Sequence, residues 1–126
     1  MDADRMSSAE FVGAYLLNGY ADRFDRDLEG NLDLHGSSEN NRLVFDELDL
    51  ENTEIYGSVH ICNITFTGDL NFYHAIVHGE GFILENLIID GDLSLPENIM
   101  EMASEGKRAV HIRNVQVKGQ IQFSHP

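Results

Sequence analysis

Pairs of mostly apolar residues separated by one residue recur along this chain, at steps that mostly alternate between 5 and 6 residues. Alternation with a period of two predicts a short β-strand in which both members of a pair face the same side. A turn after every pair limits each strand to about three residues, which is too short for a β-sandwich. The pattern therefore predicts a solenoid, whose stacked coils join the inward residues into one core. The pairs are Leu48/Leu50, Thr53/Ile55, Val59/Ile61, Ile64/Phe66, Leu70/Phe72, Ala75/Val77, Phe82/Leu84, Leu87/Ile89 and Leu93/Leu95, then Val110/Ile112, Val115/Val117 and Ile121/Phe123.

Glycines mark a longer repeat in the same region. They stand at Gly57, Gly68, Gly79 and Gly91, with gaps of 11, 11 and 12 residues, and again at Gly119. We expect these glycines at the corners of the coils. A corner often needs either a positive φ or a close approach of two backbones, and glycine permits both.

The stretch from Leu43 to Leu95, with the return from Val110 to Phe123, resembles the pentapeptide-repeat family. The resemblance implies a right-handed, four-sided β-helix, built from units of Ala-Asp/Asn-Leu-Xaa-Xaa whose Ala-like and Leu-like residues face inward. This chain departs from the unit because its Ala-like position usually holds Leu, Ile or Val. Because its period averages about 5.5 residues, a four-sided coil needs about 22 residues. A three-sided β-solenoid is the alternative.

The expected fold is a single all-β domain over residues 1–126, a parallel β-helix with a helix at its N-terminal end. Ser7 or Ser8 is the candidate N-cap, Glu10 completes a capping box and Gly19 ends the helix. The apolar face of this helix is expected to comprise Phe11, Val12, Tyr15 and Leu16. The parts in chain order are the capping helix at 7–19, coils at 30–95, a helical or loop insertion at 96–108 and coils at 109–123.

Acidic residues outnumber basic ones by 22 to 8, which gives a formal net charge of −14. From Leu43 to Gly106 the chain has 13 carboxylates and neither Lys nor Arg. This balance excludes an ordinary nucleic-acid binder and a protein that docks on anionic lipid. There is no secretion signal and no apolar run near the roughly 20 residues that span a bilayer, so we expect a cytoplasmic protein without a membrane partner.

Motifs of enzyme or metal chemistry are not evident in the sequence. The six histidines (His35, His60, His74, His78, His111 and His125) lack the spacing of a known metal motif. The single cysteine, Cys62, is expected to be a small buried or half-buried thiol. We therefore expect no catalytic residue, no metal and no cofactor.

The clustered acids favour a mimic of DNA. Ten carboxylates on three coils give about one charge per 1.4 Å, against roughly 1.7 Å for duplex DNA. Such a protein would occupy the basic groove of a nucleic-acid-binding protein and inhibit it. The resemblance supports this reading, since pentapeptide-repeat proteins include topoisomerase inhibitors that imitate DNA; a restriction or CRISPR nuclease, inhibited on behalf of a phage or mobile element, is an equal target. The expected interface residues are Asp46, Glu47, Asp49, Glu51, Glu54, Asp69, Glu80, Glu85, Asp90 and Asp92.

Outward apolar residues suggest a second kind of surface. Ile76, Ile83 and Ile88 fill the middle positions of three successive pairs, so we expect a patch covered by the 96–108 insertion or by a partner. The last coil has no evident cap, so Ile121 and Phe123 are expected at an end that pairs with a second copy. By resemblance, dimers through this end are common in the family. The alternative function is therefore a structural or self-assembling β-solenoid module.

Overall fold

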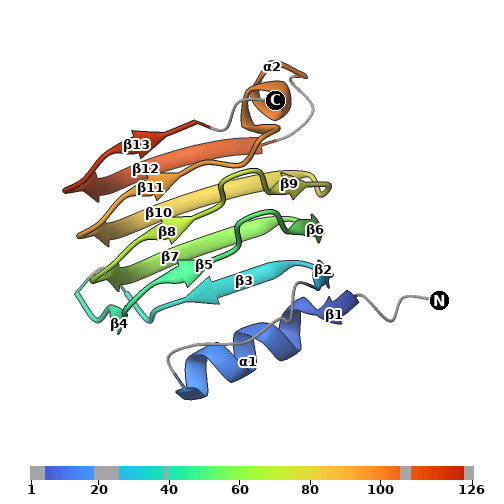
Figure 1. The fold of residues 1–126 in the computed structure, drawn as a ribbon. Coiled ribbons are helices and arrows are strands. Elements are labelled where there is room, and N and C mark those ends of the chain that lie inside the picture. The colour runs from blue at the N-terminus through green and yellow to red at the C-terminus, as the bar shows by residue number, and fades with distance from the viewer. Residues whose placement is uncertain (1–4, 19–25, 39, 106–108, 124–126) are drawn as a thin grey trace.

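The computed structural model describes residues 5–18, 26–38, 40–105 and 109–123. The described chain is mostly β-structure, arranged in three sheets of parallel strands with a helix near each end of the stack (Figure 1). The first sheet contains β1 (Arg5–Ser7), β2 (Asp27–Glu29), β6 (Glu54–Tyr56) and β9 (Ile76–Val77). The second contains β3 (Leu32–His35), β4 (Leu43–Phe45), β7 (Val59–Phe66), β10 (Gly81–Ile89) and β12 (Ala109–Val117). The third contains β5 (Leu48–Asp49), β8 (Leu70–Asn71), β11 (Leu93–Ser94) and β13 (Ile121–Gln122).

Each strand pairs with the strand that follows about one coil later. Leu48 pairs with Leu70, and Leu70 pairs with Leu93, at separations of 22 and 23 residues. The apolar pairs therefore stack on themselves, and their side chains from Leu48 to Ile89 are at most 2% exposed. This register is compatible with a solenoid and gives the coil length that the repeat predicts. The predicted limit of about three residues per strand is wrong for the second sheet, where β7, β10 and β12 have 8, 9 and 9 residues. Each of these strands runs through two apolar pairs, because the corner between the pairs does not interrupt the pairing with the next coil.

The turns use two different devices. Where consecutive pairs are five residues apart, the corner residue has a positive φ; these residues are Asn52, Asn63, His74, Asn86 and Asn114, with φ between 51° and 59°. Asparagine tolerates this left-handed region better than most residues. At these corners the side chains also form a ladder, since the Asn86 amide donates to Asn63 Oδ1 at 3.1 Å and the Asn114 amide donates to Asn86 Oδ1 at 2.8 Å.

The glycine corners serve close approach and not positive φ. A Cβ on Gly79 would lie 2.2 Å from the carbonyl carbon of Gly57, and one on Gly57 would lie 2.3 Å from that of Gly30. Only Gly30 has a positive φ, 96°, among the described glycines. Of the two reasons expected for glycine at these corners, the structure shows the close approach of two backbones and not a positive φ.

The N-terminal end is covered by α1 (Ser8–Asn18). Its first turn is capped as expected, because the Glu10 amide donates to the Ser7 hydroxyl at 3.4 Å. Phe11 and Tyr15 are buried, but Leu16 is 48% exposed, so it lies off the buried face and that part of the prediction is wrong. The expected stop at Gly19 lies outside the described residues.

Strand pairing begins earlier than the repeat indicates. β1 and β2 precede the expected first coil at residue 30 and pair in parallel, with Arg5 opposite Asp27. β2 in turn pairs with β6, and its Leu28 is fully buried. A single isolated apolar residue such as Leu28 carries no periodic signal, so only the pairing reveals these strands.

The insertion contains the expected helix, α2 (Ile99–Glu105), which packs against β12 and buries Ile99 and Met102. The segment just before α2 extends the first sheet. The Glu97 amide donates to the Ala75 carbonyl at 2.7 Å, and the Asn98 side chain makes two hydrogen bonds to the Val77 backbone, at 2.8 and 3.1 Å. The insertion therefore continues the coil before it turns into a helix.

Candidate protein-binding surfaces

Five of the ten predicted carboxylates gather where the second sheet turns into the third. These turns stack on one another, because the Gly91 amide donates to the Gly68 carbonyl and the Gly119 amide to the Gly91 carbonyl, at 2.9 and 3.0 Å. We call the carboxylates that flank these turns the acidic edge; they are Asp46, Glu47, Asp69, Asp90 and Asp92. They come from three successive coils, so the coil stacking brings together residues up to 46 positions apart.

Part of the acidic edge also supports the turns. Asp69 Oδ1 accepts the Asp92 amide at 2.7 Å, and Asp92 Oδ1 accepts the Gln120 amide at 2.8 Å. The edge ends on the last coil, where Lys118 Nζ lies 3.0 Å from Asp90 Oδ1. Asp69 and Asp92 therefore have a structural role besides their charge.

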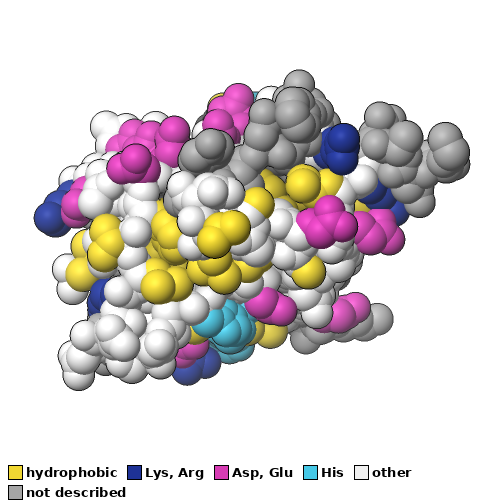
Figure 2. All heavy atoms as spheres, turned by 90° about the horizontal axis from the view of Figure 1, so that it is seen from below, with side chains coloured by type: hydrophobic (Ala, Val, Ile, Leu, Met, Phe, Trp, Pro, Cys, Tyr) yellow, Lys and Arg dark blue, Asp and Glu magenta, His cyan; other side chains and the backbone are white. Residues whose placement is uncertain are grey.

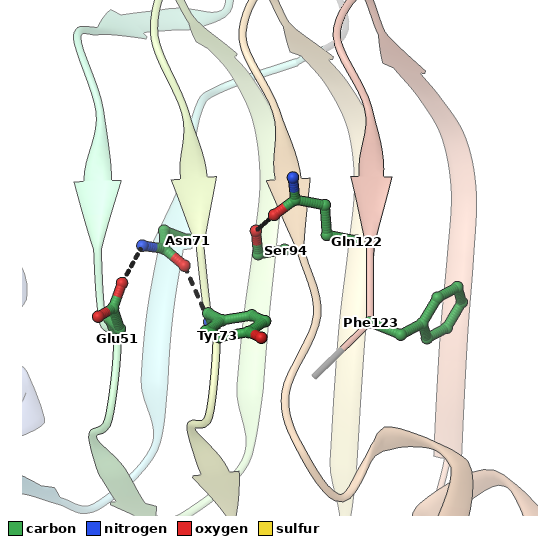
Figure 3. A pocket seen from close by; sticks show the side chains of 6 residues that line it. All are labelled: Glu51, Asn71, Tyr73, Ser94, Gln122 and Phe123. Carbon is green, nitrogen blue, oxygen red and sulfur yellow. Dashed lines mark hydrogen bonds between the residues drawn. The ribbon is translucent and has the colours of Figure 1, made fainter. Parts of the chain in front are cut away.

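Asp49 and Glu51 lie beside the acidic edge, on the outer face of the third sheet. The Asn71 amide donates to both carboxylates, at 3.3 and 3.1 Å. An open groove of about 480 Å³ crosses this face (Figure 3). Its lining residues are Glu51, Asn71, Tyr73, Ser94, Gln122 and Phe123.

The other three predicted interface acids lie elsewhere. Glu54 is in β6, where its Oε1 lies 2.8 Å from His78 Nε2. Glu80 is exposed in the turn before β10, and Glu85 is half-buried within β10. The structure therefore divides the ten residues into seven that gather on or beside one edge and three on other parts of the surface.

The three outward isoleucines do not meet in one patch. Ile76 is in the first sheet beside Glu54, whereas Ile83 and Ile88 lie in β10 on either side of the Asn86 corner. All three are half-buried. On the neighbouring strands, Ile83 lies between His60 and His111, and Ile88 lies between Thr65 and Gln116, so none of the three isoleucines pairs with another.

The last described coil exposes residues that are inward in every other coil. Ile112, Ile121 and Phe123 are 43%, 56% and 49% exposed, although their partners in the preceding coil are buried. β12 and β13 are also the outermost strands of their sheets. In the part of the chain that the structure describes, this end therefore presents apolar side chains and unpaired strand edges.

Exposed apolar side chains also occur at the opposite end. Figure 2 views the end that carries α1 and shows hydrophobic side chains gathered across its middle, with acidic groups spread around them. Leu16 and Leu17 of α1 and Val44 of β4 are 48%, 83% and 63% exposed. The two ends differ, because here a helix already covers the core.

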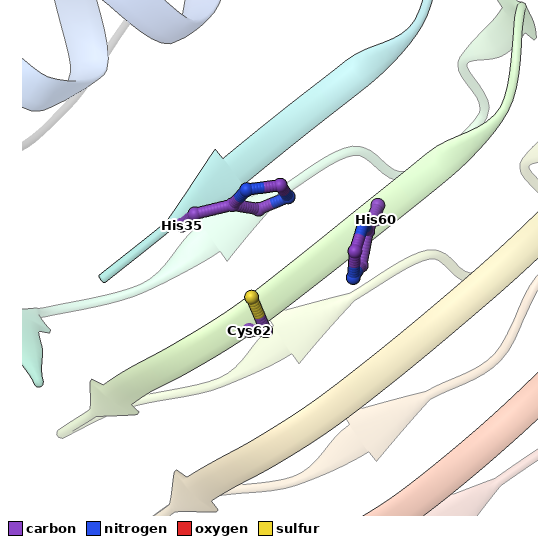
Figure 4. Close-up of side chains that lie close together, drawn as sticks. All are labelled: His35, His60 and Cys62. Carbon is purple, nitrogen blue, oxygen red and sulfur yellow. The ribbon is translucent and has the colours of Figure 1, made fainter. Parts of the chain in front are cut away.

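Three side chains that no sequence motif connects lie together on the outer face of the second sheet. His35, His60 and Cys62 come together there (Figure 4). Burial, followed by the charge of Glu85, raises the pKa of the Cys62 thiol, so the thiol is a poor nucleophile. Cys62 is half-buried as predicted.

No protein-family model matches this chain, and no curated protein or solved structure is significantly similar to it. Among the described residues, neither helix has the length and apolar character needed to cross a membrane.

Proposed function

We propose that this chain is a non-enzymatic, cytoplasmic acidic protein that binds the basic groove of a nucleic-acid-binding protein in place of DNA and so inhibits it. The observation that carries the proposal is the acidic edge, which aligns five carboxylates from three coils. Such an edge would attract a basic groove at long range and speed association. The chain itself would not bind nucleic acid, because like charges repel.

The spacing of the charges supports this proposal when the neighbouring acids are included. Parallel strands in adjacent coils lie about 4.8 Å apart, so three coils occupy about 14 Å. The five carboxylates of the acidic edge give about one charge per 3 Å over that length, and with Asp49 and Glu51 the seven give about one per 2 Å, close to the roughly 1.7 Å of duplex DNA. Asp49 and Glu51 widen the negative surface onto the third sheet.

The proposed fold is a right-handed, four-sided β-helix of the pentapeptide-like kind. The second sheet supports four sides, because β7 and β10 each carry two apolar pairs separated by an asparagine with a positive φ. In this proposal the backbone bends at Asn63 and Asn86, so that each of these strands forms two sides of the coil. A topoisomerase, a restriction nuclease and a CRISPR nuclease are the candidate targets, since all three hold DNA in basic grooves.

Charge-neutral variants of the acidic edge test the proposal. The variant Asp46→Asn, Glu47→Gln, Asp69→Asn, Asp90→Asn, Asp92→Asn removes five charges and keeps the oxygens that accept backbone amides. Binding to a purified topoisomerase, restriction nuclease and CRISPR nuclease is measured at several salt concentrations, with and without duplex DNA. We expect DNA and salt to displace the native chain, and the variant to bind at least about tenfold more weakly.

A matched control removes the same number of charges elsewhere. Five exposed or half-buried carboxylates outside the predicted interface become amides in Glu10→Gln, Glu29→Gln, Asp33→Asn, Glu97→Gln and Glu101→Gln. We expect this control to keep native affinity within about threefold, because the position of the charges and not their sum makes the site. Equal loss in both variants, or binding that DNA does not displace, would contradict the proposal.

The open end of the last coil favours a second candidate function, a self-assembling module. α1 covers the N-terminal end of the core, so one copy has no open N-terminal coil on which another could stack. Two copies would therefore pair end to end through Ile112, Ile121 and Phe123, with two-fold symmetry. Such a homodimer is compatible with the first proposal and would place two acidic edges on one particle.

A further inference from the structure

The register of the second sheet places four metal-ligating side chains on one outer face. Cys62 of β7 lies between His35 of β3 and Glu85 of β10 on the neighbouring strands. His60 precedes Cys62 by two residues on β7, so both side chains project to the same face. Three coils thus contribute to one small area.

The distances within this group fit a shared ion. One ligand atom from each of His35, His60 and Cys62 lies within 4.8 Å of the others, and the two imidazole rings are 4.3 Å apart. Figure 4 shows these three side chains on the two adjacent strands β3 and β7. Glu85 Oε1 lies 3.9 Å from His60 Nε2, too far for a hydrogen bond, and its other oxygen lies 4.0 Å from Arg113 Nη1. Glu85 lies outside the group of three whose ligand atoms are within 4.8 Å of one another, so its side chain must move to join a shared ion.

An unsatisfied atom points to a ligand at this place. His60 Nε2 is buried and has no hydrogen-bond partner. A buried polar atom without a hydrogen-bond partner lowers the stability of the folded state, so its presence requires a physical explanation. An imidazole nitrogen that binds a metal ion is satisfied by that bond.

The donor set selects the kind of ion. Imidazole nitrogen and cysteine sulfur are ligands of Zn²⁺, whereas Mg²⁺ and Ca²⁺ take oxygen ligands. With bonds of about 2.0 to 2.3 Å, a tetrahedral site needs ligand atoms about 3.5 Å apart. Ligand atoms that are up to 4.8 Å apart would have to move up to about 1.3 Å closer together to bind one ion. His35 is exposed near the end of β3, so rotation of its side chain is open to it.

We propose that His35, His60 and Cys62 bind one Zn²⁺ ion, with Glu85 as the fourth ligand. The ion would join β3, β7 and β10 across three coils and stabilise the N-terminal part of the stack. Its place on the second sheet keeps it apart from the acidic edge, so the two proposals fail independently.

Cobalt substitution tests the site directly on the full chain. Co²⁺ is titrated into the metal-free protein, and absorption is followed for the thiolate-to-cobalt band in the near ultraviolet and the d–d bands of a tetrahedral ion. We expect one Co²⁺ per chain, displaced by one Zn²⁺. Cys62→Ser should lose the thiolate band, and His60→Ala should weaken Zn²⁺ binding at least about tenfold. Absence of the thiolate band in the native chain would overturn the proposal.

The matched control is His111→Ala. His111 lies in the same outward row as His60 but two strands away, about 10 Å across the sheet, so its removal should leave the affinity unchanged. Equal weakening by His111→Ala and His60→Ala would assign binding to scattered surface histidines and overturn the site.

Protection of the thiol provides a measurement that needs no variant. Cys62 is the chain's single cysteine, so alkylation by N-ethylmaleimide reports on this position alone. Saturating Zn²⁺ should slow alkylation at least tenfold, and a chelator should restore the original rate. An unchanged rate with Zn²⁺ present would contradict thiolate coordination.

Discussion

At the scale of single residues, the stack depends on corners at which two backbones come into contact. Gly79 is an example, because an added Cβ would lie 2.2 Å from the Gly57 carbonyl carbon and 2.3 Å from the Ser58 nitrogen. Backbone atoms inside a ladder of hydrogen bonds cannot move aside as a flexible side chain does. The spacing between coils is therefore limited at these points by the absence of side chains.

The substitution Gly79→Ala should destabilise the chain by about 3 kcal/mol, since it forces the two coils apart. Urea unfolding followed by circular dichroism measures this loss. Gly13→Ala is the matched control, because Gly13 is exposed in α1 and an added Cβ there meets nothing within 4 Å. Alanine in a helix should stabilise it by about 0.5 to 1 kcal/mol. Equal effects of the two substitutions would refute the role assigned to the Gly79 corner.

At the scale of elements, the Tyr15 side chain joins α1 to β4 and to the turn after it, in addition to the Ser8 hydroxyl, which donates to the Gly30 carbonyl at 2.7 Å. The Tyr15 ring is 2% exposed and packs against Phe45, and its hydroxyl donates to the Glu47 carbonyl. Burial, followed by the charges of Asp46 and Glu47, raises the pKa of Tyr15 well above its usual value. The neutral phenol is therefore part of the folded state.

Tyr15→Phe should lower the free energy of unfolding by about 1 kcal/mol at neutral pH, through the lost hydrogen bond. Because folding raises this pKa, the contribution of Tyr15 is complete below about pH 10, the value in the unfolded chain, and decreases at higher pH. Urea unfolding at pH 7 measures the change in the free energy of unfolding.

Spectrophotometric titration of the four tyrosines measures the raised pKa of Tyr15, on which the decrease at high pH depends. The native chain should show one tyrosine that ionises late, and Tyr15→Phe should remove that component. The control Tyr73→Phe changes a half-buried ring at the groove and should keep it. If Tyr15→Phe is as stable as the native chain at pH 7 and still shows a tyrosine that ionises late, the Tyr15 contact does not hold α1.

At the scale of the whole molecule, the two ends of the stack differ. The N-terminal end has a helix over its core, whereas the last described coil exposes Ile121 and Phe123. The charge differs as well, because the described residues of this coil, 109–123, contain bases and no acid. Association through this end would cover apolar surface and strand edges together.

We expect the native chain to sediment as a dimer and the double variant Ile121→Lys, Phe123→Lys to sediment as a monomer. Two charges at a buried apolar contact oppose association. Leu17→Lys is the control at the opposite end, where Leu17 is 83% exposed, and it should leave the dimer intact. A monomeric native chain, or a dimer broken by Leu17→Lys alone, would contradict pairing through the last coil.

Local features of the structure could be predicted because their physical causes are local. Period-two alternation predicts the strands, and the Ser7 cap with an amphipathic run predicts α1. The corners with a positive φ were not predicted, although an asparagine or histidine stands between the pairs that are five residues apart at each of them. β1 and β2 could not be predicted, because their stability comes from pairing with distant strands and not from their own pattern.

The sequence by itself determined a repeat of short apolar pairs, a coil of about 22 residues and a middle stretch whose charges are all negative. The tertiary structure decided that β7, β10 and β12 each join two of these pairs into one strand of 8 or 9 residues. The tertiary structure alone decided which outward side chains become neighbours. His35 and Cys62 are 27 residues apart and Cys62 and Glu85 are 23 apart, yet both pairs are adjacent. The physical reason is register: coil lengths vary with loops and insertions, and a shift of one residue turns a side chain to the other face. The same register aligned the acidic edge and separated Ile76, Ile83 and Ile88.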